Sequence, residues 1–227
     1  MKTRNILIYI ILLVLIPAAV VSGMTFFSNK SYYIFALAVA VLSLAAVFLS
    51  LERKKSDSKK LVIISVMTAL SIVSRMIFEF APHFKPVTAF VIITGLYLGK
   101  EAGFLCGAFS ALISNFVFGQ GPWTPFQMLA WGIIGLISAL LSRFILGRLS
   151  LICLLGAVSG IVYSFLMDIY TVLWIDAHFN FSRYAAALVT AIPTTASYVV
   201  SNVLFLLVLA KPIGKKINRV KEKYGID

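Results

Sequence analysis

The chain has 227 residues, of which 61% are hydrophobic and only 12% are charged, and its formal net charge is +12. Soluble globular domains are about half apolar and about a quarter charged, so this composition excludes a soluble protein. The positive charges lie in short loops and near the C-terminus rather than along one basic face, which argues against nucleic acid and indicates contact with anionic lipid. Both cysteines lie inside apolar segments, so a disulfide framework is not expected.

Eight apolar segments predict membrane-spanning helices, because a span needs roughly 20 apolar residues and lipid offers the backbone no hydrogen bonds. The first follows the basic start MKTR and is long for a cleaved signal peptide, so we interpret it as a retained anchor. The predicted helices lie near 5–27, 32–50, 61–80, 87–99, 102–118, 127–147, 149–175 and 184–210.

Lysine and arginine residues are concentrated in alternate loops, which predicts the orientation of the chain. Basic loops face the cytoplasm, and the alternation holds over all eight segments, so both termini are predicted to be cytoplasmic. The basic stretch LERKKSDSKK divides the chain. The predicted parts are an N-terminal transmembrane hairpin (1–50), a basic cytoplasmic linker (51–60), a six-helix substrate-binding membrane domain (61–212) and a basic cytoplasmic tail (213–227).

This orientation brings most polar residues of the six-helix segment to its outer half. Arg75 and Glu79 lie four residues apart on one predicted helical face, and Asp168 lies near the outer end of the seventh helix. Ionised residues inside a membrane face protein or water. One interpretation is a structural ion pair of Arg75 with Asp168 or Glu79. We favour the other, an outward-opening polar pocket, because uncharged polar and aromatic residues accompany these charges. The candidate substrate-binding residues are Arg75, Glu79, Asn115, Gln120, Trp123, Thr124, Gln127, Tyr163, Asp168, Thr194 and Tyr198.

The segment GQGPWTP, residues 119–125, contains two glycines, two prolines and no charge. Glycine and proline predict turns, so we expect a loop before the sixth helix. A loop that covers a ligand would favour an aromatic ring and an amide over solvated charges. The segment is therefore predicted to be a lid in which Trp123 and Gln120 contact the substrate; the alternative is a rigid cap without ligand contact.

No catalytic or metal-binding motif stands out. The sequence contains no nucleophile–base arrangement, phosphate-binding glycine loop or metalloprotease motif, so we predict that the protein is not an enzyme. His83 and His178 are isolated from each other and from carboxylate or cysteine ligands, so no metal site is predicted.

Residues 61–212 resemble the substrate-binding S components of energy-coupling factor (ECF) vitamin importers. Most of the resemblance lies in the segment from Lys85 to Leu141, which reads KPVTAFVIITGLYLGKEAGFLCGAFSALISNFVFGQGPWTPFQMLAWGIIGLISALL. In that family the S component binds a vitamin from outside and joins a transmembrane coupling protein and two cytoplasmic ATPases, whose ATP hydrolysis reorients it in the membrane. The resemblance implies a multi-pass protein of a bacterial-type cytoplasmic membrane with no covalently bound cofactor, in which only the partner subunits use ATP. The family's Ala-xxx-Ala docking pattern falls on Ser65 and Ala69, where the serine departs from the pattern but stays small.

The substrate and some alternative functions stay open at this stage. The GQGPWTP form of the segment is most similar to members assigned to cobalamin, which is therefore the leading candidate. Riboflavin, pantothenate, folate, thiamin precursors and queuosine precursors are the alternatives. The competing functions are a membrane scaffold or assembly factor, whose polar residues only hold helices together, and a stand-alone secondary carrier. An intramembrane enzyme is disfavoured by the missing catalytic residues.

Overall fold

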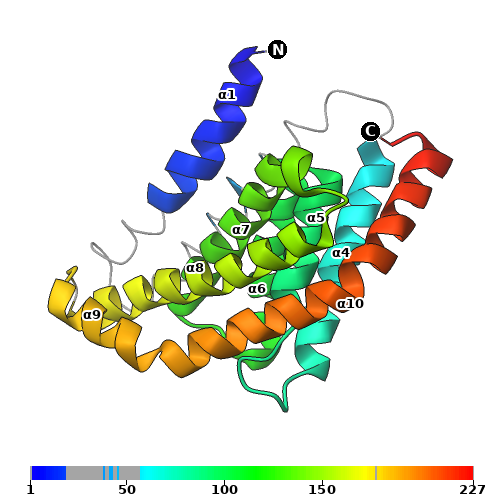
Figure 1. Ribbon diagram of the computed structural model, residues 1–227. Helices are drawn as coiled ribbons and strands as arrows, with labels where there is room; N and C mark the ends of the chain where they lie inside the picture. The colour runs from blue at the N-terminus through cyan, green and yellow to red at the C-terminus, as the bar shows by residue number, and fades with distance from the viewer. Residues whose placement is uncertain are drawn as a thin grey trace.

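The computed structural model describes residues 2–18, 38, 41–42, 45, 57–176 and 178–226. All regular structure in these residues is helical (Figure 1). Lys100, at the start of α6, donates a hydrogen bond to the Tyr9 hydroxyl of α1. The elements are α1 (Lys2–Ile10), η1 (Ile11–Leu15), α4 (Asp57–Ile77), α5 (Val87–Leu98), α6 (Lys100–Phe118), α7 (Trp123–Ile145), α8 (Leu149–Asp176), α9 (Phe181–Thr190) and α10 (Ile192–Tyr224).

Five helices of the described chain are long and apolar enough to cross a membrane. α5 differs from them, because its 12 residues rise only about 18 Å while the hydrocarbon layer is about 30 Å thick. Every α5 residue except Tyr97 is buried, so α5 is a core helix enclosed by its neighbours. The predicted class, an all-helical membrane bundle, is confirmed. The five candidate spans are Lys59–Ile77, Lys100–Phe118, Trp123–Ile145, Leu149–Asp176 and Ile192–Tyr224.

The predicted helices agree with α4 to α8 to within a few residues at each end. The predicted linker 51–60 extends into α4, which already begins at Asp57. The first predicted helix is described only as far as residue 18. The second predicted helix, and with it the proposed hairpin, lies outside the described residues apart from 38, 41–42 and 45.

The last predicted helix, 184–210, was wrong at both ends. The structure has the short helix α9, a break at Ala191, and then α10, which continues without interruption to Tyr224. Pro193 explains the break, because its ring lacks an N–H group and clashes with the carbonyl of residue 189 in a continuous helix. The predicted tail 213–227 is accordingly mostly helical and belongs to α10.

Three glycines bring α5, α6 and α7 into backbone contact at the centre of the bundle. A Cβ atom added to Gly135 of α7 would lie 2.2 Å from the carbonyl oxygen of Gly103 of α6. A Cβ on Gly95 of α5 would lie 2.3 Å from the carbonyl oxygen of Gly135. Small residues allow such close approach of membrane helices. The three helices therefore form a tightly joined unit against which α4, α8 and α10 pack.

Candidate functional site

A cavity of about 340 Å³ lies at the end of the bundle where residues 78–86 connect α4 to α5; we call this the loop end. Its wall combines residues from α4, this connecting segment, α5, α7, α8 and α10. The wall contains the basic side chains of an arginine and a lysine, one acidic side chain, several aromatic rings and three non-aromatic side chains with amide or hydroxyl groups. The lining residues are Arg75, Glu79, Pro82, His83, Lys85, Val87, Thr88, Gln127, Trp131, Gly160, Tyr163, Tyr198 and Asn202.

One wall of the cavity is a chain of aromatic contacts. The rings of Trp131 and Tyr163 stack with centroids 5.1 Å apart and an interplanar angle of 17°. Tyr163 meets Tyr198 edge to face at 5.1 Å, and Tyr198 meets His83 in the same way at 5.5 Å. His83 Nδ1 is also 3.2 Å from the Tyr198 hydroxyl oxygen, which joins the connecting segment to α10. Such a wall offers ring faces and edges to a flat ligand.

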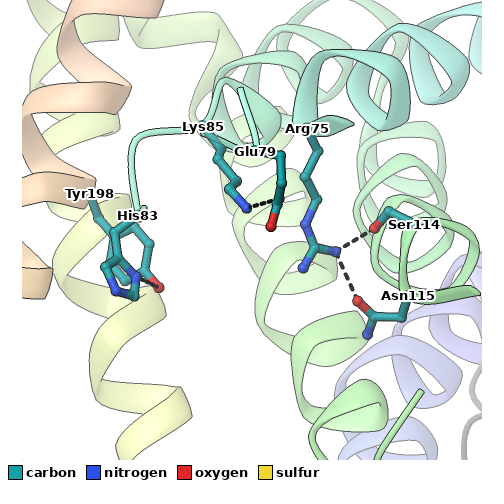
Figure 2. Close-up of polar contacts among 7 residues, drawn as sticks. All are labelled: Arg75, Glu79, His83, Lys85, Ser114, Asn115 and Tyr198. Atoms are coloured by element: carbon teal, nitrogen blue, oxygen red, sulfur yellow. Dashed lines mark hydrogen bonds and ion pairs between the residues drawn. The ribbon is translucent and has the colours of Figure 1, made fainter. Parts of the chain in front are cut away.

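Arg75 lies between two polar residues of α6 and two aromatic rings. Its Nη1 donates hydrogen bonds to the Ser114 hydroxyl and, at 2.9 Å, to Asn115 Oδ1, as Figure 2 shows. Its guanidinium carbon is 4.7 Å from the centroid of the Phe118 ring and 5.3 Å from that of Trp131. These contacts hold the guanidinium in one orientation at the edge of the cavity.

Neither ion pair considered for Arg75 forms in the described structure. α4 ends at Ile77, so Glu79 leaves the helical face that it would have shared with Arg75. Glu79 instead accepts a hydrogen bond of 2.6 Å from Lys85 Nζ (Figure 2). Asp168 is not part of the cavity wall, and its Oδ2 is buried without a hydrogen-bond partner among the described residues.

Asn115 connects Arg75 to the start of α7. Its Nδ2 donates hydrogen bonds to Thr124 Oγ1 at 2.9 Å and to Gln127 Oε1 at 2.8 Å, while its Oδ1 accepts from Arg75. Thr124 in turn donates to Gln120 Oε1 at 2.9 Å. Asn115, Thr124 and Gln120 thus form a buried or half-buried layer behind the cavity that positions Arg75 and Gln127.

The predicted lid differs from the observed structure. α7 already begins at Trp123, so the connection shortens to residues 119–122, and Trp123, Thr124 and Pro125 belong to its first turn. α6 ends at Phe118, and Gly119 directly after it has a φ of +97°, which is unfavourable for residues with a side chain. The Trp123 ring packs against Gly121, where an added Cβ would meet ring atoms at 2.3 Å. Trp123 does not line the cavity in the described structure.

The structure brings five of the predicted substrate-binding residues together in the cavity wall: Arg75, Glu79, Gln127, Tyr163 and Tyr198. The other six are absent from the wall: Asn115, Gln120 and Thr124 lie in the layer behind it, and Trp123, Asp168 and Thr194 lie elsewhere.

Eight wall residues are not among the candidates predicted from the sequence, although helical spacing indicates three of them. Trp131 is four residues after Gln127, Asn202 is four after Tyr198, and Gly160 is three before Tyr163, so each shares a face with a predicted residue. The other five residues lie in or directly after the connecting segment 78–86. Their place in the wall depends on how this segment folds over the bundle, which local sequence patterns do not predict. These five residues are Pro82, His83, Lys85, Val87 and Thr88.

Replacing Asn115 with leucine, which has a similar shape, should lower the stability of the bundle. The substitution removes three hydrogen bonds and leaves partners of the amide unpaired in a buried position, at a cost of about 2 kcal/mol. The measurement is the thermal unfolding midpoint of the purified protein in detergent. Ser142→Ala, near the opposite end of α7, is the control and should leave the midpoint unchanged; an Asn115→Leu midpoint equal to the wild type would contradict the role of this layer.

Comparison with known proteins identifies the family. A family model described as the S component of an ECF-type riboflavin transporter matches residues 55–219, which is most of the chain. Neither a curated protein nor a solved structure matches the chain. The match supports the predicted S component, while the cobalamin assignment receives no support because the matching family is the riboflavin type. This multi-pass membrane protein therefore belongs to the family of ECF-type riboflavin transporter S components, the membrane subunits that bind the substrate of an ECF vitamin transporter.

Proposed function

We propose that this S component captures riboflavin, or a closely related flavin, from outside the cell. It then delivers the flavin to the cytoplasm when a transmembrane coupling protein and two ATPase subunits reorient it in the membrane. The observation that carries the proposal is the cavity at the loop end, whose wall contains the stacked Trp131 and Tyr163 rings. The distribution of lysine and arginine supports an extracellular position for this end of the bundle.

The size and chemistry of the cavity favour a flavin over a corrinoid. Sites for small ligands have volumes of about 300–1,000 Å³, and the cavity of about 340 Å³ is at the lower end of this range. A tricyclic flavin suits that volume, whereas cobalamin is several times larger. The flat isoalloxazine ring can stack on the aromatic wall, and the description of the matching family names riboflavin.

The exposed side of α4 supports docking of the coupling protein. Ser65 and Ala69 are exposed one helical turn apart, and the neighbouring Val62, Val66 and Leu70 are exposed as well. Small side chains at four-residue spacing let a second helix approach closely, and the surrounding apolar side chains provide surface to bury. This face is therefore our candidate for the contact with the energy-coupling subunits.

Purified wild-type protein in detergent should bind riboflavin saturably and with one site per chain. The measurement is quenching of flavin fluorescence, with thermal shifts recorded for riboflavin, cobalamin, pantothenate, folate and thiamin.

Tyr163→Leu removes the central ring of the aromatic wall and should weaken riboflavin binding about tenfold or more. Tyr184→Leu, on α9 outside the cavity wall, is the matched control. Stabilisation by cobalamin but not by riboflavin would overturn the proposed substrate.

A further inference from the structure

We infer that Arg75 reads the ring system of the ligand. The N–H groups that Arg75 does not use within the protein bind the acceptor-bearing edge of a planar heterocycle, such as the N1 and C2-carbonyl edge of isoalloxazine. This inference rests on the proposed function and specifies which part of a flavin the cavity recognises.

Arg75 has more hydrogen-bond donors than the protein uses. A guanidinium carries five N–H donors and no acceptor. Nη1 uses its two donors on Ser114 and Asn115, and among the described residues the Nε and Nη2 donors have no acceptor. Nε and Nη2 are also accessible to solvent or ligand. Among the described side chains, the polar atoms that are buried without a hydrogen-bond partner are Trp131 Nε1 and Asp168 Oδ2, and neither nitrogen of Arg75 belongs to this group. In Figure 2 the second terminal nitrogen points away from Ser114 and Asn115, toward the side where His83 and Tyr198 lie.

A second feature of the site is its charge. Three charged side chains line the cavity, and Lys85 is already paired with Glu79 at 2.6 Å. The Glu79 side chain is 57% exposed, so this pair lies toward solvent. Arg75 is thus left as a partly buried cation that forms no ion pair in the described structure, and the neighbouring Glu79 carboxylate, which is bonded to Lys85, interacts with its charge only at longer range. Because burial of an incompletely compensated charge is unfavourable, a ligand atom with negative charge density stabilises the site when it approaches this guanidinium.

A third feature is the shape of the surface around Arg75. The centroid of the Trp131 ring is 5.3 Å from the guanidinium carbon of Arg75, and the same ring stacks with that of Tyr163 at a centroid distance of 5.1 Å. The donors and the aromatic wall therefore border the same space. A flat ring that packs beside this wall can present its edge to the free donors of Arg75. The recognised chemistry is accordingly an aromatic plane whose edge carries carbonyl and imine acceptors.

The test compares riboflavin with lumiflavin, which keeps the isoalloxazine ring but lacks the ribityl chain. Arg75→Gln should weaken binding of both flavins by about thirtyfold, because each loses charge-assisted hydrogen bonds at the same ring edge. Arg143→Gln, an exposed arginine at the other end of α7, is the matched control and should bind both flavins as the wild type does. Arg75→Lys keeps the charge but not the planar fork, and should recover only part of the loss.

A second readout separates ligand contact from a structural role. The reduced flavin carries negative charge at N1, so a cation at this edge raises the reduction potential of the bound flavin. The midpoint potential of riboflavin bound to Arg75→Gln should therefore be more negative than that of riboflavin bound to the wild type. Arg75→Lys should stay close to the wild type in this measurement.

The outcomes distinguish this inference from the proposed function. Wild-type protein that binds neither flavin would overturn the proposed function, whatever the variants do. Wild-type binding with equal affinities and potentials in Arg75→Gln would overturn the inference alone. A loss for riboflavin but not for lumiflavin would assign Arg75 to the ribityl chain and would also overturn it. If Arg75→Gln does not fold, Arg75→Lys decides: lower affinity for lumiflavin at an unchanged unfolding midpoint supports the inference, and unchanged affinity overturns it.

Discussion

Tryptophan in place of Ala69 is expected to abolish flavin uptake by the assembled transporter while leaving flavin binding intact. Ala69 lies on the exposed face of α4, about one turn from Ser65 and away from the cavity wall. An indole ring at this position would hold an approaching helix away from the small-residue ridge. Uptake of labelled riboflavin by cells that contain all subunits should fall to background, and the coupling protein should no longer copurify.

Leu154→Trp is the control for this experiment, because Leu154 is an exposed apolar residue of α8 that does not line the cavity. Its uptake should equal that of the wild type. The riboflavin dissociation constant of Ala69→Trp in detergent should also stay within about twofold of the wild-type value. Normal uptake by Ala69→Trp would remove this face of α4 from consideration as the docking surface.

Alanine in place of Gly135 is expected to destabilise the bundle strongly. The added Cβ would lie 2.2 Å from a backbone carbonyl oxygen of α6, and a backbone atom cannot rotate away as the end of a side chain can. Overpacking typically costs about 1–3 kcal/mol, and we expect a value at the upper end because the clash is with backbone. The expected result is a markedly lower unfolding midpoint and a poor yield of folded protein.

Leu140→Ala tests whether α7 tolerates substitution in general, since Leu140 lies on the same helix and is 45% exposed. Its unfolding midpoint should remain close to that of the wild type. A Gly135→Ala protein with a wild-type midpoint would mean that α6 and α7 can move apart at little cost, which contradicts the close packing of these helices.

The helices of the bundle could be predicted from apolar segments because lipid selects strongly for apolar helices of sufficient length. The predicted helix ends were wrong near prolines, because proline occurs both in turns and in the first turn of a helix. The sequence predicts turns at Pro122 and Pro125, but proline is also tolerated at the start of a helix, and α7 begins between them. Pro193 was read as part of an apolar helix, and in the structure it lies at the start of α10, directly after the break.

The site was harder to predict than the fold because its contacts join distant segments. The alternative interpretation, an ion pair of Arg75 with Glu79, requires a continuous helix, but α4 ends at Ile77 and Glu79 pairs with Lys85 instead. The pairing of Arg75 with Asn115 links residues 40 positions apart, which spacing along the chain cannot reveal. Tyr163 and Tyr198 could be chosen as candidates from their type and depth, but their edge-to-face contact depends on how α8 packs against α10.

The length of α10 has a consequence for the membrane in which the protein works. Its apolar part, 192–210, rises about 28 Å, which matches the hydrocarbon thickness of an average bilayer. Directly after it, Lys211, Lys215, Arg219 and Lys223 are exposed at four-residue intervals. In a thinner bilayer the apolar part would be too long, and the helix would tilt until its charged side chains lie in the headgroup layer. In a thicker bilayer the apolar part would be too short, and the charged side chains would be pulled toward the hydrocarbon layer. Hydrophobic mismatch therefore acts on the same helix that supplies Tyr198 and Asn202 to the cavity, so we expect a change in bilayer thickness to change the shape of the cavity.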